Sequence, residues 1–290
     1  MPTAKVGVIG GTGLYDIEGL TDMEEVDINT PFGKPSDTII VGKLEGVGVA
    51  FLPRHGRGHR IMPTEVPSRA NIYALKSLGV ESIIAINSVG SLREEIRHGE
   101  LVIADQLIDR TKSRINTFFG EGIVAHISFA EPFCPSLRRL LYDAAGEAGA
   151  NAHPTGTYLV MEGPAFSTKA ESNLHRSWGA DVIGMTALPE AKLAREAEIC
   201  YAIIACATDY DAWHKTEEPV SVEVVFKILQ QNIDISKKII KIAVSKVAST
   251  RVCSCASALK GAIVTAPEAM PKEKRKVLRL LIGKYIREGD

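Results

Sequence analysis

A short strand that runs into a glycine-rich turn, near the N-terminus, constrains the fold most strongly. Residues 5–9 are mostly apolar and β-branched, which is typical of a strand buried in a mixed or parallel sheet. Gly10, Gly11 and Gly13 then allow backbone angles that other residues resist, and Thr12 adds a hydroxyl donor. Because amides turned inward at such a bend form a concave anion site, the sequence predicts an anion-binding turn. A turn that only leaves the strand, with no ligand, is the alternative.

The same turn does not match the dinucleotide-binding pattern. That pattern requires a third glycine three residues after the second, and Asp16 occupies this position. A carboxylate there would face a pyrophosphate unfavourably. We therefore expect an anion that is not part of a dinucleotide.

Composition and charge exclude several classes of protein. With 290 residues, of which 45% are hydrophobic and 24% charged, the chain can bury a full core, as one large α/β domain or as two ordinary ones. The formal net charge of −1 gives no reason to expect nucleic-acid or membrane binding. No apolar run reaches transmembrane length and no signal peptide is recognisable, so we expect a cytoplasmic protein.

Apolar strand-like segments alternate with helical segments along the chain. Strands are expected at 5–9, 38–41, 47–52, 82–86, 101–104, 158–161 and 200–207, and helices at 69–78, 135–149, 168–178, 188–196, 221–247 and 271–289. This alternation predicts an α/β fold with a central mixed, largely parallel β-sheet flanked by helices. No linker divides the chain, so we expect a single domain, 1–290, with a helical tail at about 250–290.

Polar residues gather in the loops that follow the strands, where sheets of this class bind their ligands. These loops carry Thr12, Arg54, His55, Asn87, Ser88, residues 162–166, Asp209 and Asp211. One group offers donors to an anion, and the other offers carboxylates. We expect a site that holds an anion on one side and a nitrogenous or cationic group on the other.

The cysteines give no metal pattern in the sequence. The spacing of Cys134, Cys200, Cys206, Cys253 and Cys255 fits no common zinc motif, and no histidine lies near the last two. Buried, reduced thiols are the default in most cytosols, and intracellular disulfides occur in hyperthermophiles. We expect no metal and no cofactor.

Several motifs together resemble one family. They are Gly-Gly-Thr-Gly at 10–13, Asn-Thr-Pro-Phe-Gly-Lys-Pro-Ser-Asp at 29–37, Arg-His-Gly-Arg at 54–57, Gly-Ser-Leu-Arg-Glu-Glu at 90–95, Ala-Glu-Pro-Phe-Cys at 130–134, Glu-Gly-Pro-Ala-Phe-Ser at 162–167, Trp-Gly-Ala-Asp-Val-Ile at 178–183, Met-Thr at 185–186 and Ala-Thr-Asp-Tyr-Asp at 207–211. From about residue 4 to about residue 230, the chain resembles the S-methyl-5′-thioadenosine phosphorylases of the purine nucleoside phosphorylase family. The resemblance implies an enzyme, a pentosyltransferase, that converts methylthioadenosine and phosphate into adenine and 5-methylthioribose 1-phosphate, in purine and methionine salvage.

The resemblance assigns one set of residues to phosphate, which is a co-substrate. These are Thr12, Arg54, His55, Asn87, Ser88 and Thr186. An arginine can engage phosphate oxygens in a bidentate way, and a protonated histidine adds charge. Asn87-Ser88-Val89 departs from the pattern of some members, so the atoms of 87–88 that contact phosphate stay open. Taken alone, each of these residues is more often an ordinary surface residue that binds no ligand.

A second set of residues is assigned to the nucleoside. Asp209 is expected to be catalytic and to donate or share a proton at purine N7, while Asp211 accepts from the 6-amino group. Carboxylates at these positions suit 6-aminopurines, whereas relatives that prefer 6-oxopurines are expected to carry Asn at the first of them. Without the other motifs, residues 209–211 would be interpreted as a turn after a strand.

Apolar residues complete the nucleoside pocket that the resemblance implies. Met185 is expected to contact the ribose and Phe166 to form a wall of the purine pocket, although core packing is the alternative for both. The positions that tune substrate choice are Ser167 and Val222, and the residues expected to line a 5′-methylthio pocket are Val222, Val225 and Phe226. A 5′-hydroxyl would be left unpaired in that pocket. The preference between methylthioadenosine and adenosine stays open.

The resemblance also implies an oligomer and disulfides. In the family, the residue equivalent to His126 enters the site of a neighbouring subunit, which implies a homo-oligomer, a trimer or a dimer of trimers. Cys253-Ser254-Cys255 resembles an element of archaeal hyperthermophile members. We expect Cys134 to pair with Cys200 and Cys253 with Cys255, which leaves Cys206 free.

Three other functions stay open. A nucleoside hydrolase of the same fold would use water and would not need an anion site. A purine nucleoside phosphorylase acting on adenosine, inosine or guanosine is the nearest alternative, and Asp209 with Val222 argues against it. A nucleotide-binding regulator without activity would need no proton donor beside the base.

Overall fold

A computed structural model describes residues 2–11, 13–214, 222–247 and 252–286, without the side chains of 222–229. The strands are β1 (Val6–Gly10), β2 (Thr21–Val26), β3 (Ile39–Leu44), β4 (Val47–Pro53), β5 (Ser82–Ser91), β6 (Leu101–Val102), β7 (Gln106–Asp109), β8 (Ala152–His153), β9 (Thr157–Val160), β10 (Val182–Gly184) and β11 (Cys200–Asp209). The helices are α1 (Ser68–Ser77), α2 (Pro135–Glu147), α3 (Lys169–Ser177), α4 (Ala187–Glu196), α5 (Val222–Val247) and α6 (Lys272–Ile282), and short 3₁₀ turns are η1 (Ser254–Ser257) and η2 (Pro267–Ala269).

The strands form one mixed sheet whose central member is β5. The order is β2-β3-β4-β1-β5-β10-β9-β7, while β11 pairs with the other edge of β5 and continues through β6 to β8. β1, β4, β5 and β11 run parallel, whereas the β2–β3 and β3–β4 pairs and the β10–β5 contact are antiparallel. The predicted fold class, a mixed, largely parallel sheet flanked by helices, is confirmed.

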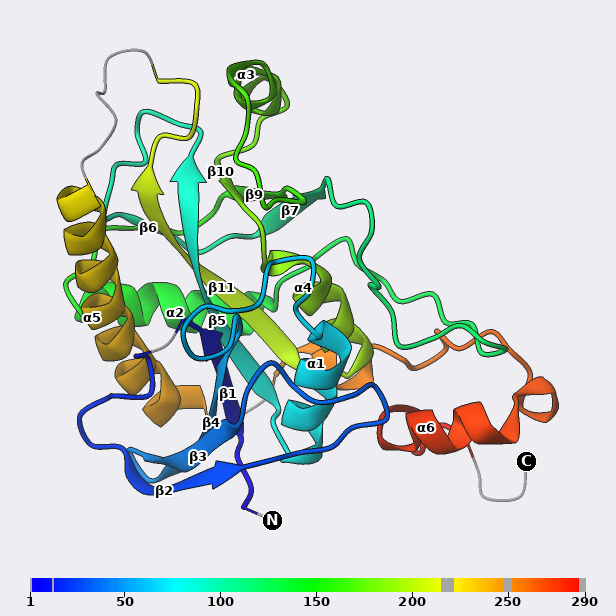
Figure 1. Cartoon of the computed structure of the whole chain (residues 1–290). Helices are drawn as coiled ribbons and strands as arrows, with labels where there is room; N and C mark the ends of the chain where they lie inside the picture. The colour runs from blue at the N-terminus through cyan, green and yellow to red at the C-terminus, as the bar shows by residue number, and fades with distance from the viewer. Residues whose placement is uncertain (1, 12, 215–221, 248–251, 287–290) are drawn as a thin grey trace.

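Helices cover both faces of this sheet (Figure 1). Alternate residues of β11 belong to different cores, since Tyr201 and Ile203 pack in the core that includes α1 and α4, while Ala202 and Ile204 pack in the core that includes α2 and α5. This period of two is what a strand buried on both faces requires. It explains why the central strands are continuous apolar runs.

Residues after 252 extend the core on the α1 and α4 face. Leu259, Leu278 and Leu281 are buried in the same cluster as the α4 side chains. The predicted helix at 271–289 is observed as α6, from Lys272 to Ile282. Among the residues that the structure describes, no helix is long and apolar enough to cross a membrane.

Four strands, β2, β7, β8 and β10, were not expected from the sequence. β2 is an edge strand whose first five residues are exposed, so it has no apolar run to reveal it. β10 is buried but has only three residues, too few for a recognisable period. β10 pairs with Gly90 and Ser91 of β5, beyond the residues of β5 that pair with β1.

Candidate active site

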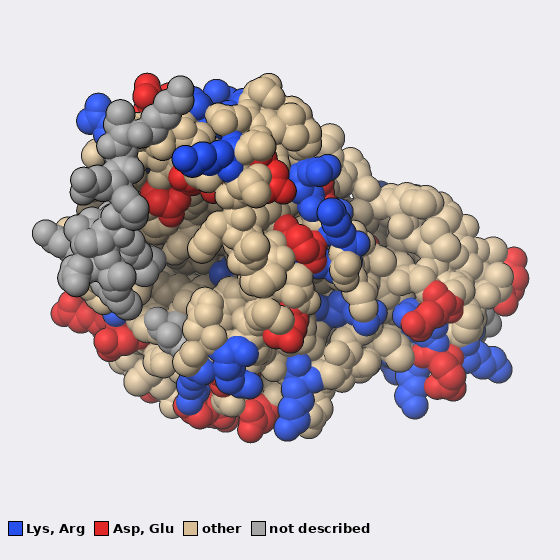
Figure 2. Space-filling model, turned by 45° about the horizontal axis from the view of Figure 1, so that its top comes forward, with Lys and Arg blue, Asp and Glu red and all other residues tan. Residues whose placement is uncertain are grey.

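The candidate site lies where the sheet divides along β5. β1 pairs with Ser82–Ala85, and β10 pairs with Gly90 and Ser91 on the same edge. Between these two pairings, three side chains approach the edge of β5. They are Arg54, which follows β4, Thr186, which follows β10, and Glu190 on α4. The carboxyl ends of the parallel strands meet here, and Figure 2, which turns this end towards the viewer, shows a hollow.

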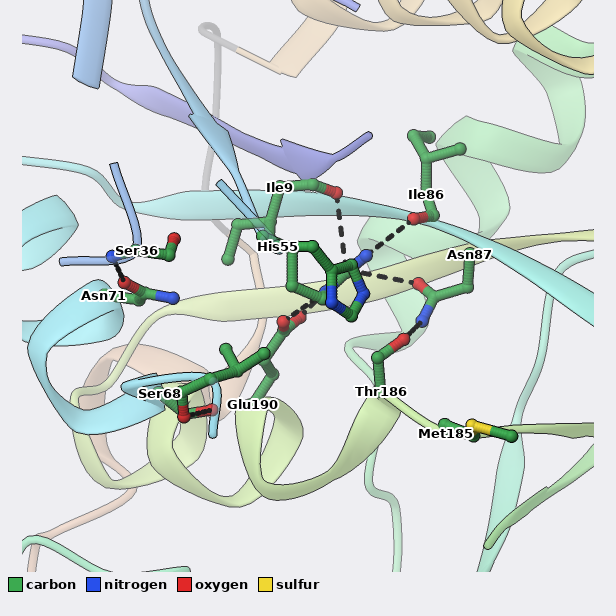
Figure 3. A network of polar contacts seen from close by, with 12 residues as sticks. Ile9, Ser36, His55, Ser68, Asn71, Ile86, Asn87, Met185, Thr186 and Glu190 are labelled. Atoms are coloured by element: carbon green, nitrogen blue, oxygen red, sulfur yellow. Dashed lines mark hydrogen bonds and ion pairs between the residues drawn. The ribbon is translucent and has the colours of Figure 1, made fainter. Parts of the chain in front are cut away.

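The side chain of Arg54 fills the gap between β1 and β10. It is 3% exposed and its Nη1 donates to the carbonyl of Ile86 over 3.0 Å. Its Nε lies 2.5 Å from Glu190 Oε1, and its Nη2 lies 3.1 Å from Glu190 Oε2. Weaker Nη2 contacts reach Ile9 O and Asn87 Oδ1, each at 3.4 Å. Figure 3 shows these acceptors directed towards one centre.

Glu190, on α4, balances the charge of Arg54. Glu190 is 1% exposed and also accepts a hydrogen bond from the Tyr201 hydroxyl over 2.9 Å. Burial alone would lower the pKa of Arg54, but the charge and hydrogen bonds of Glu190 outweigh it and raise that pKa. Among the described residues, Nη1 donates only to Ile86, so most of the guanidinium is committed to the protein rather than directed outwards.

Asn87 joins this network to Thr186, the N-cap residue of α4. Its Nδ2 donates to Thr186 Oγ1 over 2.5 Å, and its Oδ1 faces Arg54. The next residue, Ser88, is exposed on β5. The structure therefore brings four of the residues expected to bind phosphate, Arg54, Asn87, Ser88 and Thr186, to one stretch of β5 and its neighbours.

His55 follows Arg54 at the end of β4. Its Nδ1 lies 2.8 Å from the carbonyl of Ile61, and its ring stacks on His59 with centroids 4.5 Å apart. Burial lowers the pKa of His55, against the hydrogen bond to Ile61, and the Arg54 charge lowers it further. The neutral form is thus favoured, with a proton on Nδ1 and an acceptor at Nε2.

Asp209 is the last residue of β11, and Asp211 follows it at the same end of the sheet. Asp209 Oδ2 accepts from the Thr208 hydroxyl, and Asp209 Oδ1 accepts from the amide of Asp211, both over 2.8 Å. Asp211 has a positive φ of 45°, which turns the chain back. Its Oδ2 is buried and has no hydrogen-bond partner among the described residues. A buried carboxylate oxygen without a donor is costly and marks a place for one.

Gly90 makes room for these carboxylates. A Cβ at Gly90 would lie 3.0 Å from Asp209 Oδ1 and 3.2 Å from Asp211 Cβ. The β5–β11 register also shifts between Ala207 and Asp209, which redirects Asp209. The glycine and the irregular register together set the position of the carboxylates.

Met185 lies half-buried between β10 and the loop after β9. A Cβ at Gly163 would come within 2.5 Å of its Sδ, so the loop packs closely on this side chain. Arg114 ties the two segments together, since its Nη2 donates to Glu162 O over 2.6 Å and its Nη1 to Leu188 O over 2.7 Å. Nη1 also donates to the carbonyl of Met185.

For three expected residues, Phe166, His126 and Ser167, the single chain shows no contact with these groups. Phe166 is 84% exposed, so it does not line a closed wall in the single chain. His126 is exposed, and its amide donates to Ala262 O in the C-terminal segment. Ser167 is half-buried, with its hydroxyl 3.9 Å from Met161 Sδ. These three roles stay predictions.

Other expected residues lie outside the described part of the chain. Thr12 is one of them, and the side chains of Val222, Val225 and Phe226 on α5 are the others. Gly13, beside Thr12, has a φ of 101°, as the turn requires.

Sequence reasoning missed Glu190 and Arg114. Glu190 lies in a largely apolar helical segment, and an acid on a buried face signals a buried partner. Arg114 lies in a polar loop, where its sequence context gives no signal.

The predicted disulfides are not formed. No disulfide bond joins the described cysteines, which include all five, so the pairs Cys134–Cys200 and Cys253–Cys255 are corrected. The physical reason is that four sulfurs gather in one cluster instead of two separate pairs, with Cys200 Sγ 3.2 Å from Cys253 Sγ. Cys206 lies apart, 3.8 Å from Ser236 Oγ.

Comparisons with known proteins agree on one family. A model described as the phosphorylase superfamily matches residues 5–245. A curated S-methyl-5′-thioadenosine phosphorylase from Geobacter sulfurreducens is 58% identical over 282 residues, 97% of this chain and 99% of the relative. One from Hyperthermus butylicus is 51% identical over 265 residues, 90% of this chain and 96% of the relative.

Solved structures agree with these relatives. A methylthioadenosine phosphorylase from an antarctic soil metagenomic library superposes with a TM-score of 0.94 at 48% identity, covering 97% of this chain and 99% of that one. A methylthioadenosine phosphorylase from Schistosoma mansoni, in complex with adenine, gives a TM-score of 0.83 at 36% identity, covering 90% and 99%.

Proposed function

Because the chain belongs to the phosphorylase superfamily and, within it, to the S-methyl-5′-thioadenosine phosphorylases, we propose that it cleaves S-methyl-5′-thioadenosine with phosphate. The products are adenine and 5-methylthioribose 1-phosphate. A phosphate oxygen forms a bond to C1′ as the C1′–N9 bond breaks, and the purine leaves with the electron pair. This family consists of pentosyltransferases, and the proposed reaction serves purine and methionine salvage.

The phosphate is held at the gap between β1 and β10. Thr186, Ser88 and the Gly10–Gly13 turn supply donors, and Arg54 supplies a positive charge fixed by Glu190. Since Arg54 is committed to Glu190, its part is mainly electrostatic, with at most the second Nη1 hydrogen available for direct contact. Neutral His55 can accept the proton of hydrogen phosphate at Nε2.

The purine is held at Asp209 and Asp211. Each oxygen of Asp209 has one protein donor and keeps a lone pair, so the group can carry a proton taken from solvent and donate it to purine N7. That proton neutralises the charge that develops on the base as the glycosidic bond breaks. The unpartnered Oδ2 of Asp211 accepts from the 6-amino group. A 6-oxopurine would instead place an acceptor against a carboxylate.

Further parts of the site are proposed from the family. Met185 contacts the ribose, and Phe166 covers the base. Ser167 and Val222 tune substrate choice, with Val222, Val225 and Phe226 facing the methylthio group. We propose a cytoplasmic homo-oligomer, a trimer or a dimer of trimers, in which the exposed His126 reaches a neighbouring site. No cofactor takes part in the proposed reaction.

One observation carries the proposal. The donors proposed for phosphate lie at Asn87 of β5, and the carboxylates proposed for the purine lie at Gly90 of the same strand. The test is to incubate methylthioadenosine, adenosine and inosine with and without phosphate and to follow base release. We expect adenine from methylthioadenosine only when phosphate is present. Base release without phosphate would indicate a hydrolase. Preferred cleavage of inosine would indicate a phosphorylase of 6-oxopurine nucleosides, and no base release would indicate a regulator.

A further inference from the structure

Four of the five cysteines converge from three distant segments. Cys134 precedes α2, Cys200 begins β11, and Cys253 and Cys255 lie at η1 near the C-terminus. All four sulfurs lie within 4.8 Å of one another, and no carboxylate or histidine is part of the group. Cys134, Cys200 and Cys255 are buried, and Cys253 is half-buried.

The spacing of the sulfurs fits a metal better than a pair of disulfides. The sulfurs of Cys200 and Cys253 lie 3.2 Å apart, whereas a disulfide needs about 2.05 Å. A tetrahedral ion with metal–sulfur bonds of about 2.3 Å places its ligands roughly 3.8 Å apart. That value lies between the 3.2 Å of this pair and the 4.8 Å within which all four sulfurs lie, so small side-chain shifts complete the geometry.

Without an ion, hydrogen bonds among the thiols and burial raise the pKa of Cys134 and Cys255, so metal binding has to displace these protons. Cys134 is the N-cap residue of α2, where the positive end of the helix dipole favours negative charge. Lys284 donates to the carbonyl of Ala256, beside Cys255, and its charge is balanced by an ion pair with Glu198. The half-buried Cys253 gives an ion a route from solvent. A closed set of four thiolates is characteristic of structural zinc sites.

We propose that Cys134, Cys200, Cys253 and Cys255 bind one zinc ion that fixes the C-terminal segment to the sheet. On binding, four S–H bonds give up their protons to solvent and four Zn–S bonds form, with no change of oxidation state. Disulfide formation in the same cluster would remove two electrons per bond and need an oxidant. The site lies on the α2 and α5 face, on side chains other than those proposed to hold substrate.

The test compares metal content and the fate of the thiols in the full-length protein. Wild-type protein is reduced, reconstituted with zinc, freed of excess metal and measured by plasma mass spectrometry, and a second sample receives cobalt(II). We expect about one zinc per chain and the charge-transfer absorption of tetrahedral cobalt thiolate. A thiol-modifying mercurial should release the zinc.

Matched variants separate a site from adventitious binding. Cys253→Ser should reduce zinc affinity at least about tenfold, while Cys206→Ala, which changes the cysteine outside the cluster, should retain the metal. Circular dichroism and base release check that both variants fold. Absence of zinc and of the cobalt spectrum in reduced wild-type protein would overturn the proposal. So would equal binding by both variants, or cluster disulfides that exclude zinc even after reduction.

Discussion

The guanidinium of Arg54 and the carboxylate of Glu190 form a two-point ion pair at the division of the sheet, with Nε–Oε1 at 2.5 Å and Nη2–Oε2 at 3.1 Å. Both side chains are almost fully buried. The pair therefore places a fixed positive charge under the proposed phosphate site. It also makes Arg54 depend on Glu190 for its position.

Glu190→Gln should destabilise the protein strongly. Removing one partner leaves the charge of Arg54 buried without compensation, which typically costs about 3–5 kcal/mol. Tyr201→Phe removes only a hydrogen bond to the same carboxylate and should cost about 1 kcal/mol. Urea unfolding of both variants measures these losses. Equal, small effects would mean that the buried ion pair is not an important part of the fold.

Asp209→Asn should lower kcat for methylthioadenosine phosphorolysis while the fold is retained. Loss of the proton-sharing carboxylate should cost roughly 10²–10⁴-fold, because that is the usual contribution of a general acid. The matched control is Asp105→Asn, whose carboxylate likewise accepts a backbone amide over 2.8 Å, from Gly156. Steady-state kinetics and thermal unfolding separate the two effects. A kcat within threefold of wild type for Asp209→Asn would argue against the assigned role.

Gly90→Ala should impair catalysis by displacing the carboxylates. The added Cβ would approach Asp209 Oδ1 to 3.0 Å, so the side chain must move by a few tenths of an ångström. We expect kcat/KM to fall on the order of tenfold. Gly146→Ala is the control, because its Cβ would meet nothing within 4 Å on α2, and it should stabilise by about 0.5–1 kcal/mol. Unchanged kinetics in Gly90→Ala would mean that the carboxylates tolerate displacement.

Glu196→Gln should change how stability depends on pH. Burial raises the pKa of Glu196 to about 7, despite hydrogen bonds from Thr117 and the amide of Phe118. The folded protein favours the protonated carboxyl. The stability that this preference adds is fully present below the unfolded pKa of about 4.3 and is lost as pH rises to about 7. The side chain of the Glu196→Gln variant stays neutral at every pH. Its free energy of unfolding should therefore rise relative to that of wild type over this window, by up to roughly 3 kcal/mol.

Denaturant unfolding from pH 4.5 to 8 measures this difference. Glu268→Gln, which removes an exposed carboxylate in η2, controls for the loss of charge. A wild-type curve parallel to that of Glu196→Gln would contradict the raised pKa.

The sequence predicts those parts of the fold and site that depend on local pattern. The apolar runs of β1, β5 and β11 are recognisable, and so are the polar residues that follow them, such as Asn87 and Asp209. The antiparallel placement of β10 against Gly90 depends on packing between segments about 90 residues apart, so its three residues carry no signal. The ion pair between Arg54 and Glu190 likewise depends on contact between distant segments. The same is true of the cysteine cluster.

The most direct test of the proposed reaction follows the fate of the phosphate. Phosphorus NMR of enzyme, methylthioadenosine and phosphate should show a sugar 1-phosphate ester that appears in step with adenine, one for one. Adenine that accumulates at the same rate without phosphate, with free methylthioribose and no ester, would contradict phosphorolysis.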